Sequence, residues 1–237
     1  KETPGHLQVG GGQIRRVEGA RFLGVWVDEG LKWTGHIGQV RTKVGQLLGV
    51  LGRASAVMGG GSLLSLYNGL VLPHLQYCLV WGDFQGCGNV TLGGSLLRYQ
   101  KKLAGLVAGR RGLYHADPLL ARFGMLKIGA LYRQQVRIHG WRFWNGRLPA
   151  NQAAMLSRVG EVHGHATRAA RAGLFVSTRD SRSVGYRVPK EWGTLTEAQR
   201  GEGSLPAFKR GSRRGFLAEY DSFVCRDVRC AVCLGWR

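Results

Sequence analysis

Apolar side chains recur three and four residues apart along the first two thirds of the chain, and this spacing predicts amphipathic helices. The clearest helix is expected over residues 34–54, and another follows the glycine run 59–61 with a kink at Pro73. A third helix is expected over 91–108 and a further helical stretch over 117–149. The apolar face expected for the third helix comprises Leu92, Leu96, Tyr99, Leu103 and Leu106.

Two short strands are expected ahead of the helices, within residues 13–27, around a turn near Gly19. Thr34 is the expected N-cap of the helix that follows. The predicted fold class is therefore mainly α: a short N-terminal antiparallel β-hairpin, then a helical bundle.

The periodicity fades after residue 149, where Arg, Gly, Ser and Ala dominate. We expect an irregular, loosely ordered basic C-terminal tail there. The resulting division is 1–30 with the hairpin, 31–150 as a helical domain, and 151–237 as a basic region that ends in a cysteine cluster.

The charge of the chain points to its class of partner. The 237 residues carry a net charge of +20, and hydrophobic residues make up 44%, an ordinary share for a globular chain. So much positive charge indicates a polyanionic partner, with nucleic acid first and an anionic membrane second. No apolar run is long enough to span a bilayer. Abundant Arg and 38 Gly are equally typical of a GC-rich coding sequence, in which many of these residues reflect drift.

The cysteine count bears on the compartment. Five cysteines, an odd number, argue against a secreted disulfide framework, so we expect an intracellular location, nucleus or cytoplasm. The chain starts at Lys1 without an initiator Met, and we expect it to be part of a longer protein.

Motifs of self-contained enzymes are absent from the sequence. It has no GxxxxGK[ST], no HExxH and no GxSxG. Asp28 and Glu29 are adjacent at a strand end, and side-chain alternation puts them on opposite faces, where they make a poor pair for two Mg²⁺ ions. We therefore expect no catalytic residue in this chain and no nucleotide incorporation by it alone.

The order of several blocks resembles the region downstream of the palm in reverse transcriptases of non-LTR (LINE-type, Jockey-like) retrotransposons. The blocks are RFLGVWVDEGLKWTGHI, LLSLYNGLVLPHLQYCLVWG, LLRYQKKLAGLVAG, DPLLARFGMLKIGALYRQQ, GRLP and VPKEWGTLTEAQRGEGSLPAFKRGSRRGFL. The resemblance covers about residues 14–217. It implies RNA-directed DNA synthesis by the parent enzyme, whose Mg²⁺-binding aspartates and fingers lie upstream. The implied partners are RNA and DNA, as a template–primer duplex, and the upstream fingers and palm, with no membrane.

Within this resemblance, the FLG block corresponds to a hairpin that grips the primer end, here Phe22, Leu23 and Gly24. The alternative is an ordinary buried hairpin. The helices after it resemble the polymerase thumb, and their basic residues are candidate contacts to the duplex backbone, with a solvated helix face as the alternative. These candidates are Arg98, Lys101, Lys102, Arg110 and Arg111.

Three thiols near the C-terminus, Cys225, Cys230 and Cys233, have knuckle-like spacing and are candidate zinc ligands. The set is incomplete, because His163 and His165 lie about sixty residues away, outside the usual ligand spacing. Apart from this zinc, we expect no cofactor in this chain. Two other functional readings stay open: a stand-alone basic nucleic-acid-binding protein derived from a retroelement, and a non-functional pseudogene remnant.

Overall fold

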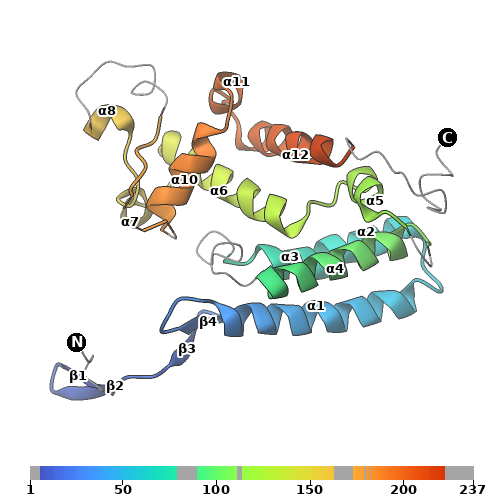
Figure 1. The fold of residues 1–237 in the computed structure, drawn as a ribbon, viewed down its shortest axis with the longest axis horizontal. Coiled ribbons are helices and arrows are strands. Elements are labelled where there is room, and N and C mark those ends of the chain that lie inside the picture. Colours follow the sequence, from blue (N-terminus) through green and yellow to red (C-terminus); the bar gives the residue numbers. More distant parts are fainter. Residues whose placement is uncertain are drawn as a thin grey trace.

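The computed structural model describes residues 6–78, 90–110, 114–162, 173–178, 180–181 and 183–221. Short β-hairpins precede a mainly helical body, which confirms the predicted fold class (Figure 1). The strands are β1 (His6–Val9), β2 (Gly12–Arg15), β3 (Gly19–Phe22) and β4 (Val25–Asp28). The helices are α1 (Thr34–Ala54), α2 (Gly60–Leu66), the π-helical turn η1 (Tyr67–Val71), α3 (Leu72–Gln76), α4 (Val90–Val107), α5 (Ala116–Arg122), α6 (Ile128–Trp144), α7 (Ala150–Ala153), α8 (Val159–Val162), α10 (Val184–Gly193), α11 (Glu197–Arg200) and α12 (Leu205–Asp221).

The strand region holds two antiparallel hairpins, β1–β2 and β3–β4, where the sequence predicted one. The predicted turn near Gly19 is wrong: Gly19 begins β3 and pairs with Asp28. The turn lies at Leu23 and Gly24, whose φ angles of 47° and 83° are both left-handed, as in the turns that suit two-residue hairpins. Gly19 serves packing, because a Cβ there would come within 2.9 Å of the Trp26 indole nitrogen.

The link from β4 to α1 is held by two side chains. The Asp28 carboxylate accepts hydrogen bonds from the backbone N–H groups of Lys32 (2.8 Å) and Trp33 (2.6 Å). Trp33, at φ 59°, occupies the N-cap position expected for Thr34, and no side chain caps the helix. The Trp26 ring lies against the first turn, where a Cβ on Gly35 would come within 2.5 Å of it. The hairpin is thereby tied to the start of α1.

The apolar stripe predicted for α1 is confirmed, with Ile37, Val44 and Leu51 buried. The stripe of the next helix differs from the prediction. The spacing of three and four residues predicts one apolar face with Leu63, Leu66, Tyr67, Leu70 and His74. The buried residues are instead four apart, and Leu70 and His74 are exposed. A π-helical turn widens the helical period just before Pro73, which explains the repeat of four. The buried residues are Leu63, Tyr67, Val71 and Leu75.

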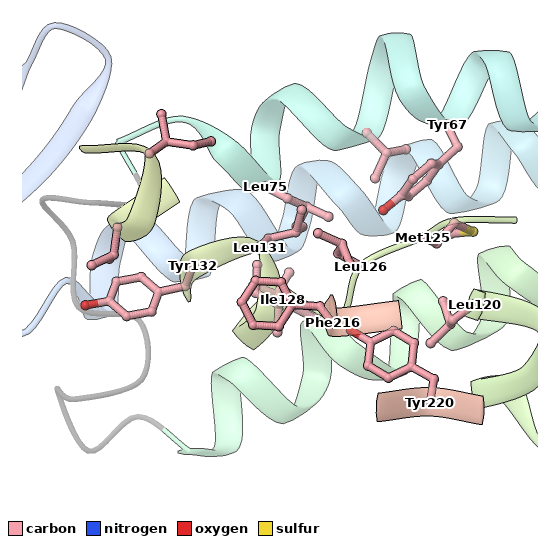
Figure 2. Packing of buried hydrophobic residues seen from close by; sticks show 14 of the residues in the cluster. Tyr67, Leu75, Leu120, Met125, Leu126, Ile128, Leu131, Tyr132, Phe216 and Tyr220 are labelled. Atoms are coloured by element: carbon pink, nitrogen blue, oxygen red, sulfur yellow. The ribbon is translucent and has the colours of Figure 1, made fainter. Parts of the chain in front are cut away.

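Gln100 of α4 is fully buried and joins α4 to η1 and to the start of α6. Its carboxamide accepts from the Ile128 N–H (2.8 Å) and donates to the Leu126 carbonyl (2.9 Å) and the Tyr67 hydroxyl (3.3 Å). The Gln100 carboxamide and its three partners are thus hydrogen-bonded inside the core. A buried polar group without a partner would lower the folding stability by about 1–3 kcal/mol. Figure 2 shows Tyr67, Leu126 and Ile128 among the apolar side chains of this region, with Phe216 beside them.

The C-terminal region is more ordered than the sequence suggested. Helices α10 and α12 pack on α6, and α12 also packs on α5 (Figure 1). The side chain of Trp192 is fully buried, and Phe208, Phe216 and Tyr220 belong to the same apolar core as α1 and α4. The expectation of a loosely ordered tail is therefore wrong for residues 183–221.

The apolar face of α12 is hard to recognise in the sequence, because polar and glycine residues separate its members. Phe208, Ser212, Phe216 and Tyr220 form the buried face at intervals of four, and one of the four is a serine. Arg, Lys and Gly fill the other positions between Phe208 and Phe216, so this part of the segment looks polar and flexible in the sequence. Burial of three aromatic rings outweighs the low helix propensity of its glycines, since each ring removes on the order of 150–250 Å² from water.

Candidate nucleic-acid interface

The basic residues predicted on α4 separate into two groups. Arg98 and Lys102 are exposed and stand four residues apart, opposite the buried Leu96 and Leu103. Gly94, one turn earlier, is exposed on the same line. With a rise of about 1.5 Å per residue, the two basic side chains are about 6 Å apart along the helix axis. They form a short basic row on the outer face of α4.

Arg110 lies just beyond the end of α4. The helix ends in a Schellman motif: the Arg110 N–H bonds the Gly105 carbonyl (2.9 Å) and the Gly109 N–H bonds the Leu106 carbonyl (3.0 Å). Gly109 takes φ 63°, the left-handed conformation that this motif requires. Arg110 is exposed, and its backbone position is fixed by the cap. Arg111 lies outside the described residues.

Lys101 belongs to a different environment. Its ammonium group is 4.0 Å from Asp117, whose carboxylate also pairs with Lys127 at 2.7 Å. The neighbouring face of α4 is closed by Tyr114, whose hydroxyl donates to the Lys101 carbonyl (3.3 Å). The charge of Lys101 is therefore partly compensated within the chain, unlike those of Arg98 and Lys102.

The predicted primer-grip residues lie at the tip of the β3–β4 hairpin. The side chains of Phe22 and Leu23 are 68% and 75% exposed, so the alternative of a buried hairpin does not hold for them in this chain. The tip is attached to the helical body, because the hydroxyl of Tyr77, the residue after α3, donates a hydrogen bond to the Leu23 carbonyl. The hairpin therefore presents two adjacent apolar side chains to solvent.

Most of the aromatic residues Tyr67, Tyr77, Trp81, Tyr99, Trp141 and Trp144 fall on the apolar stripe of the sequence, which predicts core packing rather than stacking on bases. Tyr67 and Trp141 are fully buried, which confirms this for both. Tyr77 is half exposed because it supports the hairpin tip.

Arg133 and Arg137 stand four residues apart on α6 and pair with an acidic residue of the same chain. Both guanidinium groups bind the Glu191 carboxylate on α10, at 2.8 and 3.0 Å, and both lie over the Phe216 ring. Their charges serve helix packing.

A second basic surface escaped the sequence reasoning. Lys209, Arg210, Arg213 and Arg214 are all exposed on α12. The signal was the run KRGSRR together with the four-residue apolar repeat around it. The repeat fixes which side of the helix faces the core, and hence that these four residues face outward.

The cysteine cluster Cys225, Cys230 and Cys233 lies outside the described residues. Cys78 is half-buried, and burial raises the pKa of its thiol. Within the described part of the chain, no helix is both long and apolar enough to cross a membrane.

No family model, curated protein or solved structure matches this chain.

Proposed function

We propose that this chain binds nucleic acid as the thumb and C-terminal part of a non-LTR retrotransposon reverse transcriptase. The observation that carries the proposal is the row of Arg98 and Lys102, exposed opposite the core of α4, with exposed Arg110 just beyond the end of the helix. None of the three forms an ion pair with an acidic side chain among the described residues. A surface of this kind meets phosphates, and such contacts position a duplex without reading its sequence.

The exposed hairpin tip supports the same assignment. Phe22 and Leu23 project from a turn that Tyr77 holds against the helical body. Because both side chains are already exposed, they can contact a primer end without a change in the fold of the hairpin. In this proposal the chain holds and orients the template–primer duplex. The carboxylates that bind Mg²⁺ and the chemistry of DNA synthesis belong to the palm of the parent polymerase, and the C-terminal cysteines would hold a zinc ion.

Duplex binding by the purified chain tests the proposal. The triple variant Arg98→Ala, Lys102→Ala, Arg110→Ala should bind a mixed-sequence DNA duplex more weakly than the original chain in fluorescence anisotropy. The dependence of log K on log salt should become shallower by about 0.9 per lost contact, about 2.7 in total. RNA–DNA and DNA duplexes of different sequence should respond alike, because the contacts are to phosphates.

Two control variants separate this row from net charge. Arg41→Ala, Lys43→Ala, Arg53→Ala removes the same charge from exposed positions of α1, and Lys101→Ala removes the residue paired with Asp117. Both should change the salt slope less than the α4 triple variant. An α4 variant that folds normally by circular dichroism and keeps its affinity and slope would refute the proposal. An equal loss in the α1 variant would also refute it, since binding would then follow total charge.

A further inference from the structure

Helix α12 keeps its apolar and basic residues on opposite sides. Phe208, Phe216 and Tyr220 are buried against the rest of the body, and Figure 2 shows Phe216 and Tyr220 directed into the apolar core. The exposed side carries four positive charges within six consecutive residues: Lys209, Arg210, Arg213 and Arg214.

These charges are almost uncompensated. No acidic side chain of the described residues forms an ion pair with any of the four. Glu219, an acid of the same helix, lies 3.9 Å from Arg133 instead. Arg213 donates a hydrogen bond to the Gly124 carbonyl, which holds its guanidinium beside the loop between α5 and α6. Like charges four residues apart on a helix repel each other, so a bound polyanion would relieve this repulsion.

The spacing and shape of this surface suit a sugar–phosphate backbone. Lys209 and Arg213, and likewise Arg210 and Arg214, are about 6 Å apart along the axis. That distance spans about two phosphates of one strand, which carries one charge per about 3.4 Å. Gly211 lies between them in the sequence and Gly215 follows Arg214, and a Cβ at either glycine would have nothing within 4 Å. The missing side chains leave the helix backbone open to close approach.

We propose that the outer face of α12 is a second nucleic-acid-binding surface, which contacts the phosphate backbone independently of base sequence. It depends on the proposed function only for the identity of the polyanion, since its residues are separate from the row on α4. A membrane suits this surface less well, because a helix that lies on a bilayer inserts its apolar face. The apolar face of α12 is already buried in the core. No exposed aromatic side chain stands on the described part of α12 for stacking on bases.

The test is the triple variant Lys209→Ala, Arg210→Ala, Arg214→Ala in the full chain. Arg213 is left unchanged because it contacts Gly124. With a mixed-sequence DNA duplex as probe, the salt slope should become shallower by about 2.7. The fall in affinity between about 50 mM and about 200 mM salt should therefore be smaller by roughly 40-fold. A variant with Arg210→Lys and Arg214→Lys should keep the original slope, because the charges remain.

Combining this variant with the α4 triple variant should add the two losses, since the two sets of residues share no partner. Three results would overturn the inference. The first is a folded α12 variant with unchanged affinity and slope; if the α4 variant still loses binding, the proposed function survives alone. The second is a loss of slope in the Lys-containing variant, which would show a requirement other than charge. The third is loss of binding to phosphatidylserine vesicles with DNA binding intact, which would assign the surface to a membrane.

Discussion

Replacement of Glu191 by Gln tests the packing of the C-terminal region most sharply. The Glu191 carboxylate on α10 accepts from Arg133 (2.8 Å) and Arg137 (3.0 Å), both on α6. The Arg137 side chain is 9% exposed and lies 4.4 Å from the centre of the Phe216 ring of α12. Glu191 thus joins α10 to α6, and Arg137 continues the contact to α12. The substitution keeps the shape of the side chain and removes its charge, which leaves Arg137 inside the body without a counter-charge.

The expected cost follows from this geometry. Removal of one partner of a buried ion pair destabilises by about 3–5 kcal/mol. Arg137 retains its hydrogen bond to the Thr194 hydroxyl (3.1 Å) and its place over the Phe216 ring, and Arg133 reaches solvent. These remaining interactions reduce the expected loss to about 2–3 kcal/mol. At about 2–4 °C per kcal/mol for a chain of this length, Tm should fall by about 4–12 °C.

Glu219→Gln is the matched control. Glu219 is 59% exposed and lies 3.9 Å from the same Arg133, so its loss should cost no more than about 0.5 kcal/mol. Urea unfolding followed by tryptophan fluorescence measures both variants, because Trp192 is buried one residue after Glu191. The cost of Glu191→Gln should persist in high salt, since a buried pair is weakly screened. Equal, small costs for the two variants would refute the docking of α10 through this pair.

Two further predictions concern backbone packing and alkaline stability. Gly60→Ala should destabilise by about 1–3 kcal/mol, because the new Cβ would overlap the Val107 carbonyl and force α2 away from α4. Gly61→Ala meets open space and should stabilise by up to about 1 kcal/mol, so equal shifts in thermal unfolding would contradict the packing. Burial raises the pKa of Tyr220 from 10.0 to about 12, so the folded state keeps a proton that the unfolded state loses, and stability should fall as pH rises through this window. Tyr220→Phe should lose less stability over that range in urea unfolding, and an unchanged pH dependence would refute the assignment.

The sequence was most informative where one type of residue repeats at the helical period. The stripe from Ile37 to Leu51 predicted α1 because its apolar residues keep the helical period throughout the segment and are buried in the structure. The same reasoning gave α4 to within one residue at each end and put Arg98 and Lys102 opposite the core. It erred after Leu66, because the π-helical turn changes the period and moves His74 and Leu70 to the surface.

The sequence pattern also gave a wrong prediction at Gly19, because glycine occurs both in turns and at close packing contacts. Gly19 looks like a turn residue in the sequence, but it lies in a strand because the Trp26 ring occupies the space of a side chain. The turn itself needed Leu23 in a left-handed conformation, which sequence preference for glycine does not predict. The place of Gly19 in a strand depends on the Trp26 ring of the neighbouring strand, and local sequence propensity carries no information about that contact.

By itself, the sequence determined the helical class, the direction of the apolar faces of α1 and α4, and a net charge of +20. The tertiary structure decided which charges remain available. It places Arg133 and Arg137 against Glu191 and Lys101 beside Asp117, and it leaves the outer faces of α4 and α12 without acidic partners among the described residues. The physical reason is that a charged side chain is compensated only when an opposite charge lies within a few ångströms. The compensating residues are distant in the sequence, and only folding brings them close.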